Sequence, residues 1–267
     1  MKLLTEVFKL YNGVLIPKVG YGTWQIPNSE AYQTTLDALT LGYRHVDTAK
    51  AYHNEKAVGK AIKESGLSRD EVFVTSKLPA EIKGYDVTLK AFNETLSDLG
   101  LDYLDLYLIH APWPWDKMGK DCTKENIESW KAMEVLYKEG KIRSIGVSNF
   151  SPKDIQAILD NCDIVPMVNQ IRYFIGHTQK ETVEFCNNHN ILVEAYSPLA
   201  TGKVFNDQKI KEVADQLGVS VAQLCIRYCI DKGTLPLPKT THKGRMEENA
   251  LLEFEIPKES LDLLDTL

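Results

Sequence analysis

The first half of the sequence contains four side chains with the chemistry of an acid–base group: Asp47, Tyr52, Lys77 and His110. A tyrosine has a pKa near ~10 and is a poor proton donor at neutral pH. A lysine ammonium at ~4 Å attracts a phenolate by about 4 kcal/mol at an effective dielectric of ~20, enough to lower the tyrosine pKa by roughly two or three units. Asp47 can keep Lys77 charged, and His110 can orient a carbonyl oxygen by a hydrogen bond. The set predicts general acid catalysis at a carbonyl.

Each of these residues, taken alone, also has a structural interpretation. An Asp–Lys pair usually contributes to packing or surface electrostatics, and a loop tyrosine usually packs against its neighbours. A histidine at the end of a strand is usually a polar group with satisfied hydrogen bonds. The functional interpretation gains weight because successive predicted strands deliver these side chains to one face of the fold.

Strand-like runs alternate with amphipathic stretches along the chain, which predicts parallel strands joined by helices. The length of 267 residues is typical of one (β/α)8 TIM barrel, an α/β fold. Because no Gly-, Ser- or Pro-rich linker interrupts the pattern, residues 1–267 are predicted to form a single domain. The eight predicted strands are 19–24, 43–47, 72–77, 104–110, 142–148, 164–170, 191–196 and 234–238.

Turn and capping residues predict where several elements begin and end. Residues 8–16 are expected to form an N-terminal β-hairpin, with Asn12 and Gly13 supplying the positive φ angles of a tight turn. The last helical pattern covers residues 258–267. Three helix starts are predicted from caps: Ser29 for a helix to Leu41 that Gly42 ends, Asn54 for a helix to Ser65, and Ser151 with Pro152 and Asp154 in the first turn.

A barrel of this kind carries its chemistry at the carboxyl ends of its strands, where the connecting loops converge. These positions concentrate acids, bases, amides and aromatic rings in the present sequence. They are Trp24, Asp47, Lys77, His110, Ser148 with Asn149, Asn169 with Gln170, Tyr196 and Lys239.

A cluster of basic residues follows the last predicted strand. The sequence has neither a P-loop nor a GxGxxG fingerprint, and 20–24 (GYGTW) has only two of its glycines. At 237–249, however, cationic and hydroxyl side chains gather at a predicted helix start, where free backbone N–H groups favour phosphate. The cluster comprises Lys239, Thr240, His242, Lys243 and Arg245, and it predicts a phosphate-binding site, with an ordinary solvated loop as the alternative.

Composition excludes several other classes of protein. The net charge of −6 argues against a nucleic-acid surface. The first 20 residues lack the features of a signal peptide, and the longest apolar runs are too short to cross a bilayer. The five cysteines form no CxxC pair and are interpreted as reduced thiols. A cytoplasmic protein without a membrane or nucleic-acid partner is therefore expected.

Residues 208–231 superficially match a DNA-binding helix-turn-helix. The pattern is a helix, a turn at Gly218, a capping pair formed by Ser220 and Gln223, and a second helix. The second helix has an apolar face suited to burial and few basic side chains, so it is interpreted as part of a helix pair of the barrel.

Seven motifs distributed in order over essentially the whole chain resemble those of the aldo-keto reductases, as in prokaryotic members with a short C-terminal tail. They are GYRHVDTAKAYHNE (42–55), TSKL (75–78), LIHAP (108–112), GVSNF (146–150), VNQIRY (168–173), EAYSPLA (194–200) and LPKTTHKGRMEEN (237–249). The resemblance implies reduction of aldehydes or ketones to alcohols with NADPH, by hydride transfer from nicotinamide C4, with weaker use of NADH possible. It also implies a monomer with a small carbonyl substrate.

The resemblance also implies roles for individual residues. Tyr52 would donate the proton, Lys77 and Asp47 would tune its pKa, and His110 would position the carbonyl. The cofactor would be bound by Ser148, Asn149, Gln170, Tyr196, Ser197, Leu199, Lys239, Thr240, Arg245, Glu248 and Asn249, with Tyr196 stacked on the nicotinamide and Lys239, Thr240 and Arg245 on the 2′-phosphate.

Three features depart from the family pattern and concern substrate choice. Ala111 replaces the tryptophan that commonly follows the histidine within the motif LIHWP, and Arg172 stands where the family often has a carboxylate. The chain also ends soon after its last helical pattern, without the long C-terminal loop of many animal members. An open pocket lined by Trp24, Trp113 and His110 is therefore expected, and the sequence does not specify its substrate.

Two other functions are compatible with the same residues. Lys77 at a strand end can serve as a Schiff-base nucleophile in an aldolase or lyase, although such a lysine must be neutral and Asp47 favours its charged form. A barrel that senses NADPH for a protein partner is the second alternative.

Overall fold

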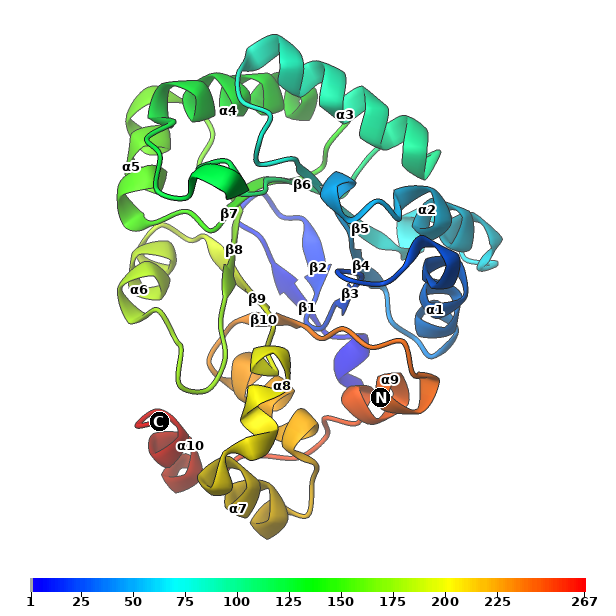
Figure 1. Ribbon diagram of the computed structural model, residues 1–267, viewed down its shortest axis with the longest axis vertical. Helices are drawn as coiled ribbons and strands as arrows, with labels where there is room; N and C mark the ends of the chain where they lie inside the picture. The colour runs from blue at the N-terminus through cyan, green and yellow to red at the C-terminus, as the bar shows by residue number, and fades with distance from the viewer. Residues whose placement is uncertain (1) are drawn as a thin grey trace.

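The computed structural model describes residues 2–267 and contains an eight-stranded parallel sheet that forms a nearly closed barrel surrounded by helices (Figure 1). The strands follow one another round the ring in chain order from β3 to β10. The predicted (β/α)8 fold is confirmed. The barrel strands are β3 (Tyr21–Gly22), β4 (His45–Asp47), β5 (Phe73–Leu78), β6 (Leu106–Ile109), β7 (Ile145–Ser148), β8 (Val168–Arg172), β9 (Leu192–Tyr196) and β10 (Leu235–Leu237).

Helices lie outside the ring of strands and cover it (Figure 1). The α-helices are α1 (Asn28–Thr40), α2 (Glu55–Glu64), α3 (Tyr85–Leu99), α4 (Thr123–Lys138), α5 (Pro152–Asn161), α6 (Lys180–Asn188), α7 (Gln208–Leu217), α8 (Val221–Asp231), α9 (Lys243–Ala250) and α10 (Lys258–Leu264). Short 3₁₀ helices are η1 (Lys2–Leu4), η2 (Lys50–Tyr52), η3 (Arg69–Glu71), η4 (Trp115–Lys117) and η5 (Ala200–Asn206). No helix within residues 2–267 is long and apolar enough to span a bilayer.

The seam between the first and last barrel strands is joined by backbone hydrogen bonds. Gly20 N–H donates to Pro236 O at 3.1 Å, and Gly22 N–H donates to Pro238 O at 3.0 Å. A Cβ at position 20 would collide with the Leu237 side chain and approach His45 Nδ1 to 2.8 Å. Glycine is thus needed where the seam closes, and the closure brings the loop after β10 beside the loop after β3.

The N-terminal hairpin consists of β1 (Val7–Lys9) and β2 (Leu15–Pro17), paired antiparallel. It lies at the amino ends of the barrel strands, because Asn12 Nδ2 donates to Arg143 O at 3.0 Å just before β7. The predicted turn is only partly correct. Gly13 has a positive φ of 89°, whereas Asn12 does not, since five residues separate the strands and Gly13 N–H closes a turn onto Leu10 O.

The predicted helix caps have mixed outcomes. Ser151 accepts a hydrogen bond from Asp154 N–H, and Ser220 accepts one from Gln223 N–H, so these two caps are confirmed. Ser29 is not a cap, because α1 already begins at Asn28 and Pro27 occupies its N-cap position.

Asn54 occupies the N-cap position of α2 but does not cap it. Its Oδ1 accepts from Thr48 Oγ1 at 3.0 Å, and its Nδ2 donates to the carbonyls of Thr23 and Ile26 at 3.0 and 3.1 Å. The side chain is buried and links the loops that follow β3 and β4. Asn54 therefore stabilises the end of the barrel at which the polar strand ends converge.

The helix pair α7 and α8 has the predicted turn at Gly218, whose φ is 66°. Several α8 side chains, including Leu224, Cys225 and Ile226, are fully buried. The helix packs against β10. Its apolar face is therefore part of the core of the barrel, as the sequence pattern predicted.

A close approach between α2 and α3 gives a stability test. A Cβ on Gly59 would overlap the backbone carbonyl of Leu99. Gly59→Ala is expected to lower the free energy of unfolding by about 1–3 kcal/mol through overpacking, although alanine in a helix normally gains roughly 1 kcal/mol over glycine. Urea denaturation measures the change. Gly244→Ala on α9 is the control, since a Cβ there meets nothing within 4 Å. Equal stabilities of Gly59→Ala and the wild type would contradict the prediction.

Candidate active site

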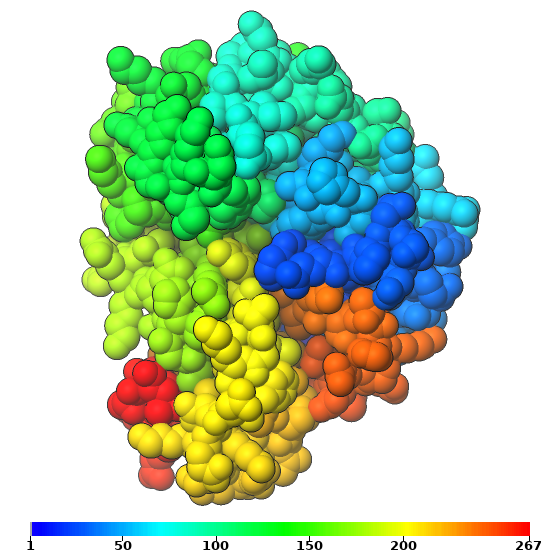
Figure 2. All heavy atoms as spheres, viewed as in Figure 1, coloured from blue at the N-terminus to red at the C-terminus, as the bar shows by residue number. Residues whose placement is uncertain are grey.

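A cavity of about 1160 Å³ opens at the carboxyl ends of the barrel strands. In the space-filling view its surroundings include the blue loop after β3, the yellow segment η5 and the orange segment that leads into α9 (Figure 2). The volume exceeds the roughly 300–1,000 Å³ of pockets for one drug-sized ligand. Its lining includes Trp24, Asp47, Tyr52, His110, Trp115, Ser148, Asn149, Gln170, Arg172, Tyr196, Ser197, Leu199, Lys239, Thr240, Arg245, Glu248 and Asn249.

Lys77 lies beneath the cavity floor and is completely buried. Its Nζ donates to Asp47 Oδ1 and Oδ2 at 2.7 and 2.8 Å and to Thr48 O at 2.9 Å. A fourth contact joins Nζ to the Tyr52 hydroxyl at 3.3 Å. Lys77 therefore connects the buried carboxylate to the phenol on the cavity wall, which is the juxtaposition that the sequence predicted.

The charges of this group follow from burial and from its partners. Although burial opposes the ammonium form, Asp47 and Tyr52 raise the pKa of Lys77 above its ordinary value. Burial also raises the pKa of Tyr52 to about 12, while the Lys77 charge lowers it. Lys77 thus acts in the expected direction, but the expected net lowering of the tyrosine pKa is wrong because desolvation outweighs it. The phenol stays protonated at neutral pH.

His110 lies beside Tyr52, with ring centroids 5.7 Å apart and the rings edge to face. Burial, with Lys77 and Lys83 nearby, lowers the pKa of His110 to about 3. The imidazole is therefore neutral. A neutral ring beside a protonated phenol provides two groups able to hydrogen-bond one carbonyl oxygen.

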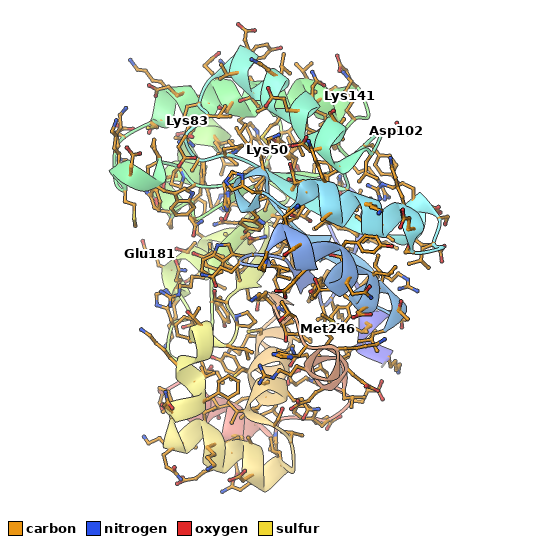
Figure 3. All side chains as sticks on the ribbon, turned by 45° about the vertical axis from the view of Figure 1, so that its right-hand side comes forward. Lys50, Lys83, Asp102, Lys141, Glu181 and Met246 are labelled. Carbon is orange, nitrogen blue, oxygen red and sulfur yellow. The ribbon has the colours of Figure 1, made fainter. Side chains whose placement is uncertain are left out.

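Tyr52 is held by a short 3₁₀ helix, η2, between β4 and α2. Lys50, which is labelled in Figure 3, begins this helix and forms an ion pair with Asp98 of α3 at 2.6 Å. Both side chains are partly exposed, so the pair contributes modestly to stability. Together with Asn54, it fixes the segment that carries the phenol.

A second buried carboxylate, Glu194 on β9, was missed by sequence reasoning. Gln170 Nε2 donates to Glu194 Oε2 at 2.8 Å and to Asp47 Oδ2 at 2.9 Å. Because both amide hydrogens are engaged by carboxylates, the amide oxygen of Gln170 is left for other partners. Glu194 Oε1 has no hydrogen-bond partner in the described part of the chain, and His45 Nε2 is 3.9 Å away. The signal in the sequence was one acidic residue within an otherwise apolar predicted strand.

The wall formed by β7 and β9 is held together by its own side chains. Ser148 Oγ donates to Gln170 O at 2.8 Å. Asn149 has a left-handed φ of 60°, and its Nδ2 donates to His110 O at 3.0 Å. The Tyr196 hydroxyl donates to Asn149 Oδ1 at 2.9 Å. These contacts place hydroxyl, amide and aromatic groups next to the acid–base group.

The opposite end of the cavity carries the basic cluster of 239–245. Lys239 and Arg245 line the cavity, and neither forms an ion pair within residues 2–267. Lys243 is turned to Asp37 at 3.6 Å instead. Thr240 is fixed through its carbonyl, which accepts from the Tyr21 hydroxyl at 2.9 Å. This end can receive an anionic group.

The outer wall has a different tryptophan from the one expected. Trp24 and Trp115 line the cavity and are 45% and 40% exposed. Trp115 also contacts His110 edge to face, with centroids 5.5 Å apart. Trp113 is not part of the lining and packs against Trp115 at 5.2 Å. The irregular loop after β6 gave no periodic pattern by which to distinguish the two rings.

Comparisons with known proteins agree with this geometry. The sequence profile described as "Aldo/keto reductase family" matches residues 18–267. Glyoxal reductase of Bacillus subtilis is 43% identical over 99% of this chain and 93% of its own length. The 9,11-endoperoxide prostaglandin H2 reductase of Trypanosoma cruzi is 41% identical over 97% of this chain and 90% of its own length.

Solved structures agree as well. An aldo/keto reductase from Brucella melitensis superposes with a TM-score of 0.92 and 40% identity, covering 98% of both chains. An aldo-keto reductase of Bombyx mori in complex with NADP superposes with a TM-score of 0.90 and 34% identity. The match covers 98% of this chain and 92% of the other. The chain belongs to the aldo/keto reductase family. It is an oxidoreductase that acts on carbonyl groups.

The buried position of Glu194 gives a pH-dependence test. Burial and Asp47 raise the pKa of Glu194 from 4.5 to about 8. An acid with a raised folded-state pKa stabilises the fold at low pH, and this contribution is lost as pH rises toward 8. Glu194→Gln is therefore expected to gain stability relative to the wild type between pH 5 and 8, by roughly 3 kcal/mol.

Denaturant titrations at both pH values measure this difference. Glu184→Gln, on the exposed face of α6, is the matched control and is expected to show no such change. A Glu194→Gln difference that is the same at pH 5 and pH 8 would contradict the assignment of a proton to Glu194.

Proposed function

We propose that this chain reduces aldehydes or ketones to alcohols with NADPH, with Tyr52 as the proton donor. The observation that carries the proposal is a protonated phenol, 3.3 Å from a buried ammonium, in the same cavity as the cations Lys239 and Arg245, which form no ion pair within residues 2–267. When bound, the cofactor supplies a hydride to the carbonyl carbon. Tyr52 gives its proton to the carbonyl oxygen, and Lys77 stabilises the phenolate that remains.

The other residues around Tyr52 orient the carbonyl group and keep the supporting charges in place. His110, neutral and adjacent to Tyr52, would hold the carbonyl oxygen by a hydrogen bond. Asp47 keeps Lys77 charged, so that the ammonium electrostatically favours loss of the Tyr52 proton. Trp24 and Trp115 provide apolar walls that exclude water from the reacting carbonyl.

The cavity fits a dinucleotide cofactor at both ends. Ser148, Asn149 and Gln170 offer hydrogen bonds for a carboxamide beside the acid–base group, and Tyr196 offers an aromatic face. At the far end, Lys239, Thr240 and Arg245 suit a phosphate, which favours NADPH over NADH. The remaining cavity contacts proposed for the cofactor are Ser197, Leu199, Glu248 and Asn249.

The burial of Lys77 speaks against an aldolase or lyase. A Schiff-base lysine must be neutral and must reach the substrate. Lys77 is held in its charged form by Asp47 and does not line the cavity. The free state of Cys122, Cys162, Cys186, Cys225 and Cys229 supports our further proposal of a cytoplasmic location, and we expect a monomer on size-exclusion chromatography.

Tyr52→Phe tests the proton donor. The variant is expected to lose about 100-fold or more in kcat/KM because phenylalanine has no hydroxyl proton to donate. Its Kd for NADPH is expected to stay unchanged. Small dicarbonyls are the first substrates to assay, given the glyoxal reductase among the relatives. Loss of NADPH absorbance follows turnover. Near-normal turnover by Tyr52→Phe would remove Tyr52 from this role.

Arg245→Ala tests the choice of cofactor. Loss of a charge-assisted bond to the 2′-phosphate is expected to raise the Kd for NADPH by roughly tenfold or more and to leave the Kd for NADH almost unchanged. Lys243→Ala is the control, because Lys243 contacts Asp37 and not the cavity. Equal effects of Arg245→Ala on both cofactors would mean that the phosphate is held elsewhere.

A further inference from the structure

Arg172 is the last residue of β8 and lines the cavity, two residues beyond Gln170 and on the same face of the strand. It is half-buried and pairs in register with Tyr196 of β9. Its carbonyl accepts a hydrogen bond from Gln179 Nε2 at 2.6 Å. The backbone at this point is therefore well anchored, and the side chain extends from a rigid strand end.

The charge of Arg172 has no acidic partner in the part of the chain that the structure describes. Its guanidinium lies 5.2 Å from the centre of the Phe174 ring and forms no ion pair with any described carboxylate. The acids on the cavity wall are Asp47, which is already paired with Lys77, and Glu248. A half-buried guanidinium without a counter-ion is incompletely compensated, so binding of an anion there is favourable.

The positive charge of Arg172 acts inside the cavity. Burial raises the pKa of Tyr196, and the charge of Arg172 opposes this shift. The Tyr196 hydroxyl in turn donates to Asn149, next to the acid–base group. Arg172 is thus electrostatically coupled to the reacting end of the cavity, whereas Lys239 and Arg245 follow β10, two strands away.

We propose that Arg172 is a specificity-determining residue that binds an anionic oxygen group, a carboxylate or a phosphate, beside the reacting carbonyl. The inference rests on the proposed carbonyl reduction. The anion has two possible sources, namely a charged group on the substrate and the pyrophosphate of the cofactor. Trp24, Trp115 and Phe205 supply exposed aromatic surface in the lining of the same cavity for the uncharged part of a substrate.

The test compares charged and neutral aldehydes of similar size. The pairs are 4-carboxybenzaldehyde with methyl 4-formylbenzoate, and succinic semialdehyde with butanal. In the wild type, kcat/KM is expected to favour the charged member of at least one pair. Arg172→Met is expected to lower that preference by roughly 10- to 100-fold, and Arg172→Lys to restore part of it.

The control variant is Lys203→Met, which removes one positive charge from the exposed surface of η5 without touching the cavity wall. It is expected to leave the preference unchanged. The Kd for NADPH, measured by quenching of tryptophan fluorescence, separates the two sources of the anion. A raised Kd with an unchanged charge preference assigns Arg172 to the cofactor pyrophosphate and rejects its role in substrate specificity. The reverse pattern assigns Arg172 to the substrate.

An unchanged preference together with an unchanged Kd in Arg172→Met would overturn the inference. Turnover of the neutral aldehydes keeps this outcome separate from the fate of the proposed function. If the wild type reduces neutral aldehydes and Arg172→Met behaves like it throughout, only the anion site is rejected. If the wild type reduces no carbonyl compound, the proposed function is rejected as well.

Discussion

The buried contact between Lys77 and Asp47 is the constraint on which the rest of the site depends. An ammonium without water is strongly unfavourable unless its charge and its hydrogen bonds are matched. The barrel meets this requirement with two carboxylate oxygens and one carbonyl, all within 2.9 Å of Nζ. The Tyr52 hydroxyl is a fourth and longer contact of Nζ, at 3.3 Å. Burial of Lys77 therefore carries a desolvation penalty, and this penalty restricts Lys77 to contacts that match its charge and its hydrogen bonds.

The pairing of β4 with β5 sets this contact. Asp47 lies opposite Thr75 in the sheet, and Lys77 follows two residues later on the same face of its strand. A shift of register by one residue would turn Lys77 away from the interior. The seam at Gly20 and Gly22 then brings the loop after β10 round to the same mouth. Closure of the barrel therefore places the cations of the last loop in one cavity with the phenol.

Much of this arrangement was predictable from the sequence, because the barrel strands are apolar runs that end in polar residues. Each of the eight runs overlaps a barrel strand, although β5 and β8 extend one and two residues beyond the predicted ends, and Asp47, Lys77 and His110 lie around Tyr52 as expected. Properties that depend on tertiary contacts were not predictable. The side chain of Asn54 prefers two loop carbonyls to its own helix, and the loop after β6 presents Trp115 to the cavity.

Burial accounts for the remaining differences. The sign of the pKa shift at Tyr52 depends on desolvation, which no local motif reveals, and it exceeds the effect of the nearby ammonium. Glu194 stands out in the sequence as an acid within an apolar strand, but its connection to Asp47 through Gln170 is visible only in the tertiary structure. The resulting site stores its proton on a phenol and keeps the supporting charge out of solvent.

A double-mutant cycle on Tyr52→Phe and Lys77→Met tests most directly whether the buried ammonium of Lys77 acts through the Tyr52 phenol. If Lys77 acts through the phenol, Lys77→Met lowers the rate of single-turnover reduction in the wild type and adds no further loss in the Tyr52→Phe background. Retained NADPH binding verifies that each variant is folded. Losses that multiply in the double variant would contradict the account, because Lys77 would then act independently of Tyr52.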